Sequence, residues 1–145
     1  MIFLVGYNGS KESRAALALA REHAVSFKAK VFIVASTFGG AKETPADIDK
    51  AEQDLAFAGK FMLEKNIEYE CFQLVRGMTP GEDLVRMAEE KAVDQIYVGI
   101  EKRSRTQKIL LGSNAQFIIL KAPCPVVTVN ADATRNREDI SESSR

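Results

Sequence analysis

Residues 95–113 read QIYVGIEKRSRTQKILLGS, and this stretch decides the fold. It begins with a short β-branched and aromatic run, residues 95–98, which is typical of a buried strand. It ends with Gly112 and Ser113, and the apolar run that follows to Leu120 predicts a helix. A strand, a connecting loop and a helix in this order form the repeating unit of parallel α/β sheets.

The same alternation runs through the rest of the chain. Five apolar runs predict strands, at residues 2–7, 31–35, 68–75, 95–98 and 125–129. Four amphipathic stretches predict helices, at residues 10–27, 44–65, 79–91 and 113–120. Strands that alternate with helices pair in parallel, and continuous apolar strands are covered on both faces. We therefore expect an α/β fold, an open Rossmann-like sheet of five parallel strands with two helices on each face.

Three of the predicted helices begin at capping residues. Ser10 is an N-cap candidate, Thr44 precedes a proline at the first helical position, and Thr79 forms a capping box with Glu82. In the second helix the spacing of apolar residues predicts inward-facing side chains at Ile48, Leu55, Met62 and either Phe57 or Ala58.

Composition limits the classes of function. The 145 residues include 20 Lys and Arg against 20 Asp and Glu, which argues against nucleic acid or a membrane surface as partner because both require a sustained positive field. Cys71 and Cys124 lie far apart without a CxxC motif, so neither a zinc site nor a disulfide framework is predicted.

No signal peptide or membrane span is predicted, and we expect a cytoplasmic protein. The expected organisation is one domain over residues 1–130 and a mobile polar tail over 131–145.

The loop after the fourth strand combines three features that suit phosphate. Gly99 allows the backbone to approach a ligand at the strand end. Gly112 and Ser113 open a helix, whose free N–H groups and dipole attract anions. Four cations lie between these glycines, at Lys102, Arg103, Arg105 and Lys108. A solvated basic loop is the alternative, but a position after the fourth strand of an α/β chain favours a binding site.

This spacing resembles the nucleotide-binding signature of the universal stress protein family, G-x2-G-x9-G-[S/T]. The frame here is Gly99, two residues, Lys102, nine residues, and then Gly112 and Ser113. Residues 5–10, 94–99 and 124–129 are similar to the family's first, fourth and fifth strands. The resemblance covers about residues 1–130 and implies the strand order 3-2-1-4-5.

The resemblance also implies a function. It implies a dimeric stress-response regulator that binds ATP, ADP or AMP, with or without Mg²⁺, and that signals through its dimer or through a protein partner yet to be identified. By matching position, the residues that would contact the nucleotide are Asn8 and Ser36 at adenine, Gly99, Gly112 and Ser113 at the phosphates, and Lys102, Arg103 and Arg105 as sources of positive charge.

Two residues depart from the family pattern. Lys102 stands at the second glycine, and Asn8 stands where an aspartate is usual. The lysine either makes a charge-assisted bond to phosphate or closes the site, and a closed site leaves a dimeric interaction module that binds no nucleotide. Asn8 offers hydrogen bonds but supplies no carboxylate to a metal or a ribose.

Catalysis has little support in the sequence. His23 is the only histidine and falls in the middle of a predicted helix, so no base is placed to activate water and any ATP hydrolysis should be slow. Residues 9–13 resemble the SGGxDS loop of adenylating pyrophosphatases but lack its second glycine and its aspartate. An adenylating enzyme is therefore the least favoured interpretation, and we predict no catalytic residue and no metal ligand.

The last predicted strand, residues 125–129, is expected at a sheet edge. It is short, apolar and β-branched, without a lysine or glutamate to block pairing with another chain. Two identical edges pair antiparallel about a two-fold axis, and the family resemblance implies the same assembly. We therefore predict a homodimer in which Val126, Val127 and Val129 meet their counterparts.

Overall fold

The computed structural model describes residues 1–101, 103–105 and 108–131. In chain order the elements are β1 (Ile2–Gly6), α1 (Lys11–Phe27), β2 (Lys30–Thr37), α2 (Pro45–Leu63), β3 (Tyr69–Val75), α3 (Pro80–Glu90), β4 (Gln95–Ile100), β5 (Arg103–Arg105), β6 (Lys108–Leu110), α4 (Ser113–Lys121) and β7 (Val126–Asn130). Lys102 and the predicted tail beyond Ala131 lie outside the described residues.

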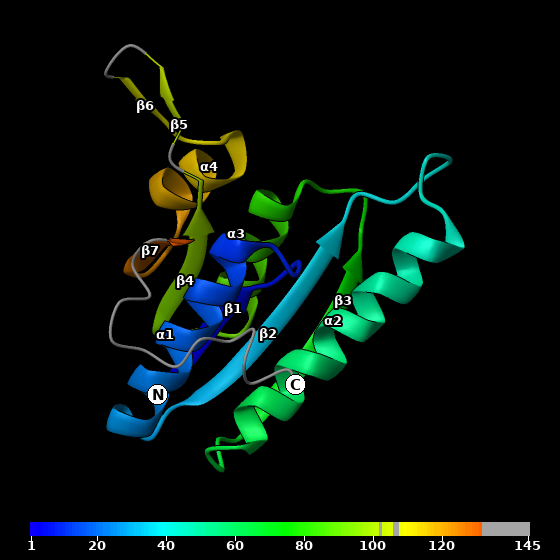
Figure 1. The fold of residues 1–145 in the computed structure, drawn as a ribbon. Helices are drawn as coiled ribbons and strands as arrows, with labels where there is room; N and C mark the ends of the chain where they lie inside the picture. Colours follow the sequence, from blue (N-terminus) through cyan, green and yellow to red (C-terminus); the bar gives the residue numbers. More distant parts are fainter. Residues whose placement is uncertain (102, 106–107, 132–145) are drawn as a thin grey trace.

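Five strands form one parallel sheet in the order β3-β2-β1-β4-β7 (Figure 1). In the central strand β1, Leu4 pairs with Phe32 of β2 on one side and with Ile96 of β4 on the other. Counted within this sheet the order is 3-2-1-4-5, which confirms the prediction. The chain moves outward from β1 to β3 and then crosses to β4, so the direction of winding reverses between β1 and β4. Ligands of open α/β sheets bind at such a reversal, outside the carboxyl ends of the strands.

Two helices cover each face of the sheet, as predicted (Figure 1). α1 and α2 pack on one face, where Leu17, Phe61 and Tyr97 lie in one buried apolar cluster. α3 and α4 pack on the other face, where Leu84 and Ile118 lie in a second cluster. Both clusters consist of apolar side chains removed from water, and burial of each large one, such as Leu17 or Ile118, stabilises the fold by about 1.5–3 kcal/mol.

The predicted helix starts are confirmed. Ser10, Thr44 and Thr79 each accept a hydrogen bond from the backbone N–H three residues on, and the two threonines form complete capping boxes. One inward-facing position is wrong: Ile48 is 40% exposed, because the buried stripe of α2 begins one turn later, at Ala51.

The segment predicted as a loop after β4 contains a short antiparallel hairpin. β5 pairs with β6 in a register that places Arg103 opposite Leu110 and Arg105 opposite Lys108. The hairpin stands out from the body of the domain next to α4 (Figure 1). The backbone of Arg103 and Arg105 is therefore placed, and their side chains lie outside the described part of the structure.

The two edge strands are β3 and β7. On β7, the side chains of Val126 and Val127 are half-buried and that of Thr128 is exposed. Val129 is only 2% exposed, because it packs into the core beneath α1. Of the three valines predicted at a dimer interface, two thus have side chains that a partner can reach at this edge.

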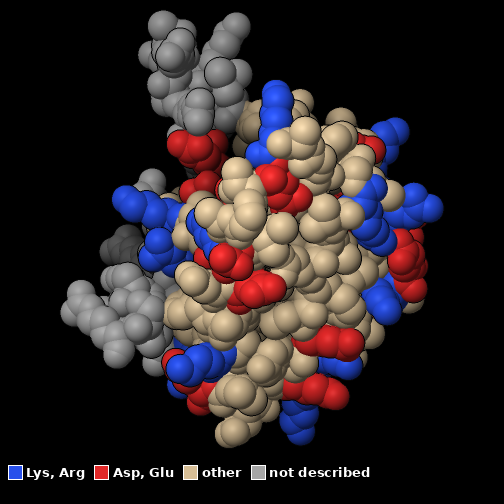
Figure 2. All heavy atoms as spheres, turned by 90° about the vertical axis from the view of Figure 1, so that its right-hand side faces the viewer, with Lys and Arg blue, Asp and Glu red and all other residues tan. Residues whose placement is uncertain are grey.

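Charges are dispersed on the face of the molecule formed by α2 and β3. Figure 2 shows basic and acidic side chains interspersed around an uncharged area. Lys50 pairs with Asp54 at 2.7 Å, and Lys30 pairs with Glu70 at 3.3 Å. This pattern agrees with the zero net charge of the chain. No helix in the described part of the chain has the length and apolar character needed to cross a membrane.

Candidate functional site

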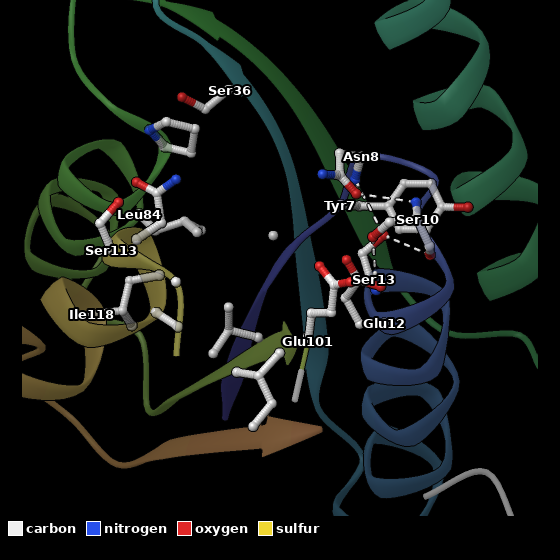
Figure 3. A pocket seen from close by; sticks show the side chains of 18 of the residues that line it. Tyr7, Asn8, Ser10, Glu12, Ser13, Ser36, Leu84, Glu101, Ser113 and Ile118 are labelled. Carbon is white, nitrogen blue, oxygen red and sulfur yellow. Dashed lines mark hydrogen bonds between the residues drawn. The ribbon is translucent and has the colours of Figure 1, made fainter. Parts of the chain in front are cut away.

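A cavity of about 580 Å³ opens at the reversal point, where the carboxyl ends of β1, β2 and β4 face the N-terminal ends of α1, α3 and α4. It brings together five of the predicted site residues, Asn8, Ser36, Gly99, Gly112 and Ser113. In Figure 3, Asn8, Ser10 and Glu12 line one wall, and Leu84, Ser113 and Ile118 line the opposite wall. Its volume falls within the range of small-molecule sites.

A second cavity of about 320 Å³ adjoins the first on the side of α2. Tyr7, Asn8 and Ser36 line both cavities, so the two form a continuous hollow at the ends of β1 and β2. Phe38 lies on the rim of the smaller cavity, and its side chain is 60% exposed.

The N-terminus of α4 is open to the larger cavity. Gly112 is the N-cap residue, and it brings no side chain to cap the helix. Gln116 is the first residue of α4 whose N–H reaches a helical partner, the Gly112 carbonyl at 3.1 Å. The N–H groups of Ser113, Asn114 and Ala115 have no partner among the described residues, and all three residues line the cavity. Such N–H groups, with the helix dipole behind them, attract anions.

The two glycines of the signature meet different surroundings. A Cβ atom added to Gly112 would have no heavy atom of the described residues within 4 Å, so these residues leave the space open. A Cβ added to Gly99 would collide with the backbone of Glu12 and come within 2.6 Å of the Ser13 nitrogen. The structure thus gives Gly99 a packing role against the first turn of α1, and the predicted approach of its backbone to a ligand stays a prediction.

The turn after β1 is held rigidly. The Asn8 side-chain oxygen accepts the Ser10 N–H at 3.0 Å, and the Asn8 carbonyl accepts from Lys50 Nζ at 2.8 Å. Arg14 Nε donates to the Gly9 carbonyl at 3.0 Å, and Gly9 itself has φ +80, a conformation that favours glycine. This wall of the cavity is thus preorganised by its own hydrogen bonds.

A buried polar group lies behind Ser36. The Ser36 hydroxyl donates to Asp83 Oδ2 at 2.5 Å, and Arg76 Nε donates to Asp83 Oδ1 at 2.8 Å. Asp83 is fully buried, and Arg76 also binds Glu90 at 3.1 Å. The hydrogen bond from Arg76 to Asp83 raises the pKa of Arg76, so this guanidinium stays charged.

Sequence reasoning missed Asp83 and Arg76. Asp83 sits between Glu82 and Leu84 in the first turn of α3, where an acidic residue is ordinary helix chemistry. Its carboxylate is held by Arg76, seven residues earlier and directly after β3, and by Ser36 of β2, which is 47 residues away in sequence. No local signal in the sequence distinguishes it from a solvent-exposed carboxylate.

Two carboxylates, Glu12 and Glu101, lie at the cavity (Figure 3). Magnesium sites in phosphate-binding proteins commonly combine one or two carboxylates with phosphate oxygens. Within residues 1–101, 103–105 and 108–131 there is no cluster of three or more His, Cys, Asp or Glu side chains that could hold a metal. His23 lies elsewhere, with Nδ1 at 2.6 Å from the Tyr97 hydroxyl.

A parallel open sheet with three helix N-termini around a cavity at its reversal point defines an α/β protein of the Rossmann-like class. Residues 1–130 match the universal stress protein family, and the chain belongs to this family.

Solved structures agree with this assignment. A universal stress protein from Archaeoglobus fulgidus is 35% identical with a TM-score of 0.81, and the match covers 89% of this chain and 98% of that one. A universal stress protein structure from the same organism, in complex with dAMP, is 31% identical with a TM-score of 0.74. This match covers 89% of this chain and 97% of that one. Two curated universal stress proteins of Methanocaldococcus jannaschii match over shorter stretches, one of them 30% identical over 89 residues, and these stretches cover 29% and 48% of the relatives' lengths.

Proposed function

We propose that this protein binds an adenine nucleotide, ATP, ADP or AMP, in the larger cavity, and that it acts in the cytoplasm as a dimeric regulator of a stress response. The observation that carries the proposal is the open N-terminus of α4, where three N–H groups face the cavity without partners among the described residues. The relative from Archaeoglobus fulgidus in complex with dAMP, 31% identical, supports the same class of ligand.

The proposed nucleotide places its phosphates on the N–H groups of Ser113, Asn114 and Ala115. Its base lies toward Ser36, where Val34 and Leu84 supply apolar walls. Asn8 and Tyr7 lie on the facing wall and suit the base or the ribose. Lys102, Arg103 and Arg105 supply positive charge for the phosphates. If Mg²⁺ accompanies the nucleotide, Glu12 and Glu101 would hold it, and the ion would neutralise phosphate charge.

Hydrolysis of the nucleotide should be slow. The titratable side chains along the larger cavity are Tyr7, Glu12 and Glu101. Burial, together with the nearby Asp54 charge, raises the pKa of Tyr7 to about 12, so this phenol stays protonated at neutral pH. The only histidine, His23, does not line this cavity and lies instead beside Tyr97, so no imidazole is placed there to activate water.

Acid extraction of the purified protein, followed by nucleotide chromatography, tests the proposal. The expected result is an adenine nucleotide released in an amount comparable to the protein, or its uptake on incubation with AMP, ADP or ATP. Neither retention nor uptake would favour the alternative, a dimeric interaction module with the site closed by Lys102. Release of pyrophosphate with adenylyl transfer would instead indicate an adenylating enzyme.

A further inference from the structure

The network behind Ser36 fixes the direction in which its hydroxyl group can hydrogen-bond. Asp83 accepts from Arg76 at one carboxylate oxygen and from Ser36 at the other. An ionised carboxylate has only acceptors, so the proton between Ser36 and Asp83 belongs to the serine. The Ser36 oxygen is then left with lone pairs alone for any further partner. Ser36 is half-buried and lines both cavities, so a ligand can reach it.

The opposite wall carries the complementary polarity. The Asn8 side-chain oxygen accepts a hydrogen bond from the Ser10 N–H. This bond distinguishes the two ends of the amide, so the other end is the nitrogen, which is a donor. That nitrogen is turned toward the cavity in Figure 3, and it has no partner among the described residues. Ser36 and Asn8 lie toward the same end of the cavity in this view, away from Glu101. This end of the site thus offers one acceptor and one donor whose directions the protein itself fixes.

From this arrangement we propose that Ser36, held by Asp83, selects a base that carries an exocyclic amino group over one that carries a carbonyl at the same position. An amino group donates to the Ser36 oxygen, and an adjacent ring nitrogen accepts from Asn8. A carbonyl oxygen in place of the amino group would face the serine lone pairs with no proton between them. A buried polar group left unpaired in this way disfavours binding. Asp83 and Arg76 act as positioning residues, because they reach the ligand only through Ser36. This inference rests on the proposed nucleotide binding.

The direct test compares AMP with IMP, in which a carbonyl replaces the amino group and the adjacent ring nitrogen carries a hydrogen. We expect calorimetric titration of the unmodified protein to give at least about tenfold tighter binding of AMP. In Ser36→Ala the preference should fall severalfold, because AMP loses its acceptor and IMP loses the unfavourable contact at this position. Asn8 retains the part of the preference that comes from the ring nitrogen. Thr37→Val is the matched control, since Thr37 makes the same kind of bond, to Glu43 at 2.6 Å, one residue along β2 and outside the larger cavity. It should keep the preference of the unmodified protein.

Asp83→Asn tests whether the Ser36 hydroxyl proton points at Asp83 rather than into the cavity. The asparagine can still accept from Arg76, but its amide nitrogen donates to Ser36 and releases the serine proton toward the cavity. The preference for AMP should then fall at least as far as in Ser36→Ala, because the serine proton now suits a carbonyl and opposes an amino group. Circular dichroism shows whether this buried variant folds, and if it does not, Ser36→Ala decides the question alone.

The outcomes separate this inference from the proposed function. Equal binding of AMP and IMP by the unmodified protein, or a full preference retained in Ser36→Ala, would overturn the selection by Ser36 and leave nucleotide binding intact. Binding of neither nucleotide would overturn both.

Discussion

Lys102 stands where the family signature has a glycine, so its substitution distinguishes a phosphate ligand from an obstruction. We expect Lys102→Gly to weaken ATP binding about tenfold, or about 1.4 kcal/mol, through loss of a charge-assisted bond to phosphate. Lys102→Ala should weaken it to a similar extent, which separates the lost charge from added backbone freedom. Calorimetry measures both variants, and stronger binding by Lys102→Gly would identify the lysine as an obstruction.

The other two glycines of the signature should respond differently to alanine. Gly99→Ala should lower the free energy of unfolding by about 1–3 kcal/mol, because its methyl group meets the backbone of Glu12 and Ser13 in α1. Gly112→Ala should cost less than about 1 kcal/mol, because its methyl group enters open space and only the N-cap preference changes. Thermal or urea unfolding monitored by circular dichroism compares them, and equal losses would contradict the packing role of Gly99.

At the scale of the elements, β4 is joined to α1 through Tyr97. Its phenol is buried, receives a hydrogen bond from Gln95 at 2.7 Å and lies 2.6 Å from His23 Nδ1. Burial raises the pKa of Tyr97 from 10.0 to about 12, because the phenolate would lose its hydration. The folded state therefore holds the proton more tightly than the unfolded state. This contribution to stability is complete below pH 10 and is lost as the pH rises through 12.

Absorbance at 295 nm tests this expectation. In the folded protein at pH 11, the signal of ionised tyrosine should be smaller than in the protein unfolded by guanidinium. Tyr97→Phe should remove part of that difference, and the pKa of about 12 for Tyr7 accounts for another part. Full ionisation of every tyrosine at pH 11 in the folded chain would contradict the burial of these phenols.

The sequence predicted most of the elements because their signals are local. The inner strands β1, β2 and β4 contain continuous apolar runs, and Thr44 and Thr79 cap their helices through residues three positions away. Features that depend on distant neighbours were missed. Ile48 has the helical spacing of a core residue yet lies one turn before the buried stripe, and Asp83 becomes part of the site only through β2 and the residue after β3. Gly99 was expected at the site, but the reason for it, contact with α1, could be seen only in three dimensions.

At the scale of the whole molecule, β7 lies at an edge of the described sheet, where a second copy can add a strand. Its Val126 and Val127 side chains are half-buried, and α4 nearby exposes Phe117 and Leu120. An apolar edge without lysine or glutamate favours pairing, and a closed pair of identical edges requires a two-fold axis. We therefore expect a homodimer, and Val127→Lys should give a monomer of lower stability because it carries a charge into an apolar seam.

Light scattering at tens of micromolar measures this assembly. The expected mass of the unmodified protein is twice the 16.0 kDa of the chain. The control variant is Thr128→Lys, whose side chain lies on the exposed side of the same strand, and this variant should remain a dimer. A mass near 16.0 kDa for the unmodified protein would exclude the dimer at this concentration.

The central claim is that the N-terminus of α4 holds the phosphates of an adenine nucleotide. Calorimetric titration of ADP into the unmodified protein and into Gly112→Val tests it most directly, because valine places a branched side chain in the open space before the first N–H groups of the helix. We expect binding by the unmodified protein and at least tenfold weaker binding, a loss of about 1.4 kcal/mol, by a folded Gly112→Val variant. Equal affinity in the two proteins would contradict this placement of the site.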